Sequence, residues 1–237
     1  MAKAETDKPA HRSARAALEQ LAPGMRVGLF GGSFHPAHIG HLHVAETARK
    51  RLGLSRVLWL VSPGNPLKQP HLWQGYAQRA ASARTMTAAH PGQFVCESEQ
   101  AFGTRYTVQT VRGFQARWPG VHFVWIMGAD SLQNFHLWRD WQQLAVQIPI
   151  AIISRPGDLV RPRLSPFARR FAQARLPDFA ATALAGTNAP AWVYLPAPMQ
   201  VQSSTAIRQG EDKSPMVTVP RCVRTADKPT NNLETQT

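Results

Sequence analysis

Residues 27–52 constrain the fold of this chain more than any other stretch, because they combine a strand, a glycine turn and a helix. Residues 27–30 form an apolar run typical of a buried strand, and Gly31 and Gly32 follow at once. Two glycines let the chain turn sharply and let a ligand approach the backbone. From residue 40 the spacing becomes helical, with one face formed by His41, Ala45, Ala48 and Leu52. The first N–H groups of such a helix are unpaired and its dipole end is positive, so the turn is suited to binding phosphate.

Two histidines lie across the first turn of this expected helix. His38 and His41 are three residues apart, so both rings can point toward whatever binds at the helix start. The helix end disfavours the imidazolium form, and an arriving polyphosphate reverses that effect, so that both rings donate hydrogen bonds to phosphate oxygens. The alternative is that one ring caps the helix and the other packs. His43 lies about 160° from His41 around the helix and is expected to face solvent.

The composition fits one domain with tails. The chain has 237 residues, of which 43% are hydrophobic, enough for one doubly wound domain. It contains no run of eighteen apolar residues and no secretory signal at its N-terminus, so we expect neither a membrane span nor export. Cys96 and Cys222 are far apart and have no partner motif, which favours a reducing, cytoplasmic location.

The charge is strongly basic and does not by itself decide between partners. The net charge of +13, from 27 basic and 14 acidic residues, is compatible with nucleic acid and with small polyanions such as ATP. The densest basic group comprises Arg161, Arg163, Arg169, Arg170 and Arg175. The basic residues do not form one block with interleaved aromatics, so we interpret this group as a solvated helix face. We predict small-molecule substrates, no nucleic acid and no membrane partner, and leave the oligomeric state open.

Further apolar runs of strand length alternate with helical segments. The expected strands are 56–61, 94–97, 121–127, 149–153 and 191–195, and the expected helices are 75–90, 105–118 and 166–175, with one helical turn around 14–21. Strands separated by helices pair in parallel through crossovers. The sequence therefore predicts an α/β fold with a doubly wound, mostly parallel sheet in a single domain.

A second helix start is expected at residues 202–208, with the sequence Gln-Ser-Ser-Thr-Ala-Ile-Arg. Its hydroxyl groups can cap the helix, but no Glu or Gln stands three residues on to complete a capping box. The N–H groups are then left for an anion, which Arg208 can also reach from one turn into the helix. The alternative is an ordinary capped helix on the surface.

The stretch from Gly31 to His41, Gly-Gly-Ser-Phe-His-Pro-Ala-His-Ile-Gly-His, resembles the signature of the nucleotidyltransferase superfamily. It most resembles the bacterial nicotinate-nucleotide adenylyltransferases, although His35 stands where that family usually has Asp or Asn. Residues 203–208 resemble the family's Ser-Ser-Thr-x-Ile-Arg motif. The resemblance covers roughly residues 26–210 and implies a Rossmann-like nucleotidyltransferase fold.

The resemblance also implies the site residues. Those expected to bind ATP are Gly31, Gly32, Ser33, Phe34, His38, His41, Gly128, Asp130, Ser203, Ser204, Thr205 and Arg208, with His38, His41 and Arg208 as the catalytic residues. Those expected to bind nicotinate mononucleotide are Lys68, Tyr106, Thr107 and Trp138. Mg²⁺ is the implied cofactor and bridges ATP phosphates, and no protein ligand for a metal is predicted.

Two of these positions have plain structural alternatives, and one departure from the family leaves a choice open. On spacing alone, Asp130 could cap a helix, and Trp138 could be a core residue as Trp141 is expected to be. Arg105, where the family commonly has Ser or Thr, could be a surface cation or could face the carboxylate of the substrate.

The implied reaction transfers AMP from ATP to nicotinate mononucleotide, giving nicotinate adenine dinucleotide and pyrophosphate in NAD biosynthesis. The alternatives are a related adenylyl- or cytidylyltransferase using nicotinamide mononucleotide or phosphopantetheine, or a non-catalytic module that binds nucleotides or nucleic acid. The His-Ile-Gly-His sequence at 38–41 also spells the first signature of class I aminoacyl-tRNA synthetases, but their Lys-Met-Ser-Lys-Ser-like loop is absent from this sequence. We predict a flexible extension at 1–24, an adenylyltransferase domain at 25–210 and a poorly defined tail at 211–237.

Overall fold

One parallel sheet forms the centre of the molecule. The computed structural model describes residues 16–63, 75–97, 102–154 and 164–196. Within them, seven strands pair in parallel in the order β3-β2-β1-β4-β5-β7-β6. Their bounds are β1 Arg26–Gly32, β2 Arg56–Val61, β3 Gln93–Cys96, β4 His122–Gly128, β5 Ile150–Ile153, β6 Arg175–Leu176 and β7 Trp192–Leu195. The prediction of a doubly wound, mostly parallel α/β sheet is confirmed.

The helices connect these strands. Their bounds are α2 Ile39–Arg51, α3 Tyr76–Thr87, α5 Thr107–Arg117, α6 Ala129–Asn134, α7 Trp141–Gln147 and α8 Pro166–Arg170, with 3₁₀ segments η2 Phe135–Leu137, η4 Ala172–Ala174 and η5 Asp178–Gly186. The helix expected at 166–175 is shorter than predicted. The carbonyl of Phe171 accepts a hydrogen bond from the Trp192 indole at 2.7 Å, and the chain then pairs with β7 as the short strand β6.

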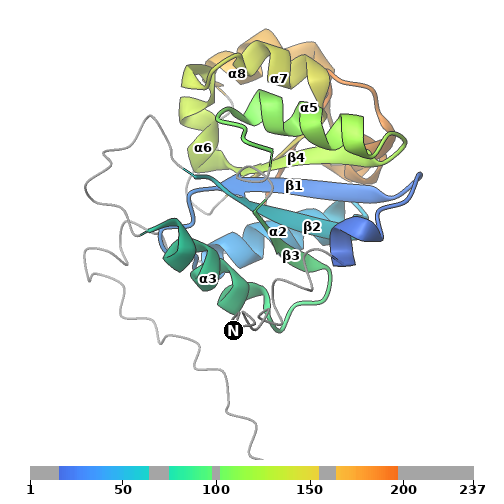
Figure 1. Ribbon diagram of the computed structural model, residues 1–237. Coiled ribbons are helices and arrows are strands. Elements are labelled where there is room, and N and C mark those ends of the chain that lie inside the picture. Colours follow the sequence, from blue (N-terminus) through green and yellow to red (C-terminus); the bar gives the residue numbers. More distant parts are fainter. Residues whose placement is uncertain (1–15, 64–74, 98–101, 155–163, 197–237) are drawn as a thin grey trace, which may run out of the picture.

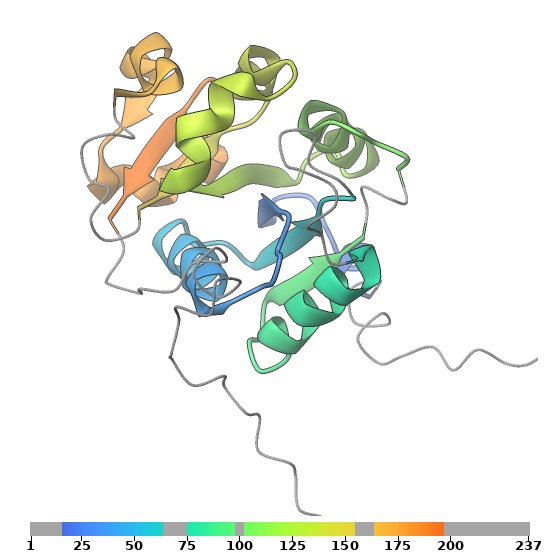
Figure 2. The ribbon, with the colours of Figure 1, turned by 90° about the vertical axis from the view of Figure 1, so that its left-hand side faces the viewer.

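Helices cover both faces of the sheet (Figures 1 and 2). Alternate strand residues belong to two separate core clusters, so that in β4 Phe123, Trp125 and Met127 face one way while Val124 and Ile126 face the other. Helices α2, α3 and η5 pack on one face, and α5, α6, α7 and α8 pack on the other. Strands buried on both faces need continuous apolar runs, which is why the sequence predicted them well.

The connections out of the two central strands define where a ligand can bind. Strand β1 lies between β2 and β4. The chain leaves β1 at Gly32 into α2 on one face, and leaves β4 at Gly128 into α6 on the other face. In open α/β sheets, ligands bind at the carboxyl ends of strands where the connections diverge in this way.

Residues 16–24 pack against this body. Ala17 and Leu21 are buried, and the backbone carbonyl of Ala17 accepts a hydrogen bond from the Arg56 guanidinium at 2.5 Å. The N–H of Gly24 donates to the carbonyl of Gly120 at 2.8 Å. Across the described ranges, none of the helices combines the length and the apolar character needed to cross a bilayer.

Candidate active site

The glycine turn after β1 is packed tightly against aromatic rings. A Cβ atom at Gly31 would overlap the ring of Trp125, and one at Gly32 would stand 2.8 Å from the ring of Phe34. Phe34 itself has a left-handed backbone with φ of 45° and is buried. Both glycines are therefore required by contacts within the protein, in addition to any approach of a ligand to the backbone.

Both histidines cap helix α2. The Nδ1 atom of His38 accepts a hydrogen bond from the N–H of Gly40 at 3.1 Å, and the Nδ1 atom of His41 accepts one from the N–H of His38 at 3.3 Å. A neutral imidazole that accepts at Nδ1 carries its proton on Nε2. The structure thus shows both rings as caps through Nδ1, and a phosphate role for Nε2 stays a prediction.

An aromatic cluster packs against the ring of His41, which in turn contacts the ring of His38. The rings of His38 and His41 lie 3.8 Å apart between centroids, and the His41 ring meets Phe34 edge-on at 5.1 Å. Phe34 lies 5.0 Å from Trp59 of β2. The Trp59 indole donates to the side chain of Gln93 at 2.8 Å in turn. This packing fixes the direction of both imidazoles.

The hydrogen-bond chain continues from the sheet back to α2. The amide of Gln93 donates to Glu46 at 2.6 Å, and Arg49 donates to the same carboxylate at 3.3 and 3.2 Å. Partial burial acts to raise the pKa of Glu46, but the hydrogen bonds from Arg49 and Gln93 and the charges of Arg49 and Lys50 outweigh it, so the pKa lies below its usual value.

Two neighbouring histidines have surroundings that the sequence did not indicate. The expectation that His43 faces solvent is wrong, because the residue is half-buried and its Nε2 atom is enclosed without a hydrogen-bond partner among the described residues. His35, at the position where the resemblance expects Asp or Asn, is buried in the turn.

The carboxyl end of β4 contributes Gly128 and Asp130. Gly128 is the N-cap of α6, and Asp130 lies in the first turn of that helix, so the N-cap alternative for Asp130 is wrong. A Cβ atom at Gly128 would collide with the carboxylate of Asp130. Because Gly128 has no side chain, the carboxylate of Asp130 can lie against it at the end of β4. Asp130 itself is exposed.

Tyr106 and Trp138, both expected to bind the pyridine, lie on the other face of the sheet. Tyr106 is the N-cap of α5, its N–H donates to Gln109 at 3.3 Å, and Thr107 begins the helix; both are half-buried. Trp138 is also half-buried and contacts Phe135 edge-on at 5.3 Å. Arg105, left open above, is exposed.

Trp138 and Trp141 do not share a helix, although their spacing suggested one. The chain interrupts the helical region at Asp140, which has a left-handed backbone with φ of 53°, and α7 begins at Trp141. The ring of Trp141 packs against Phe135 at 6.0 Å and Phe171 at 6.2 Å, in keeping with a packing role. The guanidinium of the intervening Arg139 lies 5.9 Å from the Tyr106 ring.

One buried ring connects the two parts of the predicted site. Trp125 of β4 fills the space beside Gly31 and meets Trp138 edge-on at 6.2 Å. The turn predicted for ATP and the ring predicted for the mononucleotide therefore pack against the same side chain. Five predicted site residues lie outside the described residues: Lys68, Ser203, Ser204, Thr205 and Arg208.

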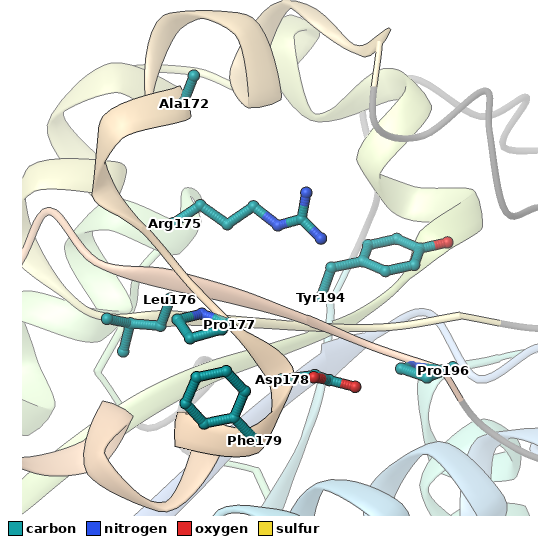
Figure 3. A pocket seen from close by; sticks show the side chains of 8 residues that line it. All are labelled: Ala172, Arg175, Leu176, Pro177, Asp178, Phe179, Tyr194 and Pro196. Carbon is teal, nitrogen blue, oxygen red and sulfur yellow. The ribbon is translucent and has the colours of Figure 1, made fainter.

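A surface pocket of about 550 Å³ lies elsewhere, at the β6–β7 edge of the sheet. Arg175, Asp178, Phe179 and Tyr194 are among its lining side chains, and Figure 3 shows Arg175 extending toward Tyr194. None of the predicted site residues that the structure describes lines it.

Sequence reasoning missed two side chains of α3 that contact the glycine turn. The guanidinium of Arg79 donates to the carbonyl of Ser33 at 2.7 Å, and the hydroxyl of Ser82 accepts from the N–H of Ala37 at 3.2 Å. A signal for Arg79 was present, because it falls on the same helical face as Ala80, Ala83 and Thr87, all buried. An arginine on the apolar face of a helix usually has a specific partner.

The sheet order and the capped glycine turn define the class of protein. Residues 29–210 match the family model described as cytidylyltransferase-like. A protein of Caulobacter sp. is 55% identical over 189 residues, covering 80% of this chain and all of that protein, and one of Roseobacter denitrificans is 47% identical over 197 residues, covering 82% and 96%. Both bear the name "Probable nicotinate-nucleotide adenylyltransferase". The chain belongs to the nicotinate-nucleotide adenylyltransferase family.

A solved structure supports the fold independently. The nicotinic acid mononucleotide adenylyltransferase of Plasmodium falciparum, complexed with NaAD, superimposes with a TM-score of 0.58. The match covers 81% of this chain and 87% of that one at 14% sequence identity. At this identity the likeness concerns the arrangement of strands and helices.

Proposed function

We propose that this chain transfers AMP from ATP to nicotinate mononucleotide, forming nicotinate adenine dinucleotide and pyrophosphate. The family relatives support this activity. The observation that carries the mechanism is the start of α2, where His38 and His41 both accept backbone hydrogen bonds at Nδ1. Two donor nitrogens are thereby fixed beside a positive helix end whose first turn holds no acidic residue.

The reaction needs positioning and charge neutralisation more than proton transfer. A phosphate oxygen of the mononucleotide forms the new bond to the α-phosphorus of ATP, while the bond from that phosphorus to the bridging oxygen breaks and pyrophosphate leaves. The nucleophile is already an anion, so the protein need supply no general base. Its task is to hold the two phosphates in line and stabilise the charge that gathers on the leaving group.

We assign the binding of the ATP phosphates, and the stabilisation of charge on the leaving group, to His38, His41 and Arg208. In this proposal the backbone of Gly31 to Phe34 lies along the nucleotide, and the residues 203–205 bind the triphosphate from a second helix start. Gly128 and Asp130 follow β4, where a carboxylate is suited to accept from ribose hydroxyls.

The mononucleotide part is assigned to Tyr106, Thr107, Trp138 and Lys68. A half-buried indole offers a surface on which a pyridinium ring can stack. We assign Mg²⁺ to ATP itself: it would arrive bound to phosphate oxygens and water, and it would neutralise part of the charge on the triphosphate. We place the enzyme in the cytoplasm.

The direct test compares three acceptors in one pyrophosphate-release assay with ATP and Mg²⁺: nicotinate mononucleotide, nicotinamide mononucleotide and phosphopantetheine. The proposal predicts release that depends on nicotinate mononucleotide and is fastest with it. Release driven best by phosphopantetheine would make the chain a related transferase with another acceptor. Retention on nucleic acid that salt abolishes, with no turnover of any acceptor, would make it a binding module.

A further inference from the structure

Arg79 is a buried cation beneath the proposed ATP site. Its residue is only 1% exposed, and it lies in the first turn of α3. The guanidinium donates to the carbonyls of Ser33 at 2.7 Å and Ser62 at 2.8 Å through Nη1, and to that of Pro63 at 3.3 Å through Nη2. The first of these carbonyls belongs to the turn after β1 and the other two to the loop after β2.

The planar fork of an arginine suits this bridging role. A guanidinium presents several donors in one rigid plane, so it can hold backbone groups from two loops at fixed separation, whereas an ammonium group offers only a point charge. Burying such a group is costly, and an apolar side chain would often stabilise a core equally well. The presence of an arginine here therefore suggests a role beyond filling space.

The same helix holds the glycine turn at a second point. Ser82, one turn further along α3, accepts the N–H of Ala37 at 3.2 Å. The two contacts lie on either side of Phe34, whose left-handed backbone must be held in place by its surroundings. The turn is also tied to β2 by the hydrogen bond from Ser62 N–H to the carbonyl of Gly32 at 3.0 Å.

We propose that Arg79 is a positioning residue for AMP transfer, which fixes the Gly31–Phe34 turn against the loop after β2 in the geometry that receives the triphosphate. The inference rests on the proposed function in naming the reaction, and its link to ATP is the contact of Arg79 with Ser33. Arg79 also adds a buried positive charge close to the place where a polyanion binds. Tyr106 and Trp138, two described residues assigned to the pyridine, pack on the opposite face of the sheet, and Lys68 lies outside the described residues.

This separation gives a readout that a general loss of stability would not produce. A partly unfolded variant loses active enzyme, which lowers the apparent kcat and leaves both KM values unchanged. A misplaced turn instead weakens ATP binding and lowers kcat, while the KM for nicotinate mononucleotide stays the same. Displacing a positioned group by about 1 Å can cost on the order of 10²-fold in rate.

The experiment compares Arg79→Ala and Arg79→Lys with Arg84→Ala, a control on the same helix that removes an ion pair with Glu97. For Arg79→Ala we expect kcat/KM for ATP to fall by about 10²-fold and the KM for the mononucleotide to change less than about twofold. Low-millimolar guanidinium chloride should restore part of the activity by entering the vacated space, and sodium chloride at the same concentration should not. The kcat/KM for ATP of Arg79→Lys should lie between those of Arg79→Ala and the unmodified protein. That of Arg84→Ala should match the unmodified protein.

ATP binding in the absence of any acceptor, measured by calorimetry, separates this inference from the proposed function. Weaker ATP binding in Arg79→Ala and Arg79→Lys supports the positioning role even if nicotinate mononucleotide proves not to be the acceptor. Unchanged ATP binding and an unchanged kcat/KM for ATP would overturn it, as would losses that track the folded fraction alone. If Arg79→Ala does not fold, Arg79→Lys decides by the same criteria.

Discussion

The two halves of the proposed site are built in different ways. The ATP half is held by hydrogen bonds around a buried histidine: His38 is 3% exposed, and backbone groups of its turn are bound by His41, Arg79 and Ser82. The mononucleotide half, with Tyr106 and Trp138, is half-buried and supported mainly by ring contacts. From these contacts we expect the ATP half to be the more rigid of the two before any substrate arrives.

The difference follows from where charge changes during AMP transfer. Negative charge shifts between phosphate oxygens, and stabilising it efficiently requires donors whose directions are fixed beforehand. The pyridine ring does not react, so it needs only a surface and modest selectivity. If this comparison is right, changes in the first half should cost rate and changes in the second half should cost affinity for one substrate.

The largest effect is expected for His41→Ala. Loss of the Nε2 donor should lower kcat by on the order of 10²-fold or more, while loss of the Nδ1 acceptor should cost about 1 kcal/mol of stability through the helix cap. His41→Asn separates the two, because its side-chain oxygen can still accept from the N–H of His38. Asn should recover the melting temperature and not the activity. Activity that rises and falls with stability in both variants would make His41 a packing residue.

A slightly smaller effect is expected for Gly31→Ala, measured as the free energy of unfolding in urea. The added methyl group would overlap Trp125, so either the turn or the indole must move, at a cost of about 1–3 kcal/mol. Gly186→Ala is the matched control, since a Cβ atom there meets nothing within 4 Å. Because Trp125 also contacts Trp138, the Gly31 variant should raise both KM values. An increase in the KM for ATP alone would show that the two halves of the site are independent.

Trp138→Ala should mainly raise the KM for nicotinate mononucleotide, by about tenfold, since stacking of a base on an aromatic ring contributes about 1–3 kcal/mol. The KM for ATP should stay nearly the same. Trp141→Ala serves as the control: it removes ring contacts with Phe135 and Phe171 and should lower the melting temperature without changing either KM. Equal changes in both KM values for Trp138→Ala would remove its stacking role.

The sequence predicted the parts of this arrangement that depend on local pattern. The apolar runs of β2, β4, β5 and β7 identified buried parallel strands, because such strands cannot alternate polar and apolar residues. The paired glycines identified the strand-to-helix turn. The start of α2 was predicted from the change of spacing after that turn.

The parts that the sequence did not predict depend on contacts between distant segments. That Gly31 must be glycine could be expected, but not that the group beside it is Trp125 from β4. The capping by both histidines depends on ring rotamers, and the break at Asp140 depends on a left-handed residue that no turn motif announced. The place of Arg79 on the apolar face of α3 was visible in the sequence, but its partners were not, because they are backbone carbonyls of two other segments.

The smallest expected effect concerns the support behind the ATP half. Glu46→Gln removes the charge that Arg49 and Gln93 bind, and should lower the free energy of unfolding at pH 7 by on the order of 0.5 kcal/mol, since the pair is partly exposed to solvent. The pKa of Glu46 is lowered in the folded protein, so its contribution is fully present above the unfolded value of about 4.3. It is lost as the pH falls through the lower, folded-state pKa. Urea unfolding of both proteins from pH 7 downward should therefore show the difference shrinking only below about pH 4.3. A difference that persists to lower pH would mean that Glu46 contributes through its hydrogen bonds with Gln93 and Arg49 and not through its charge.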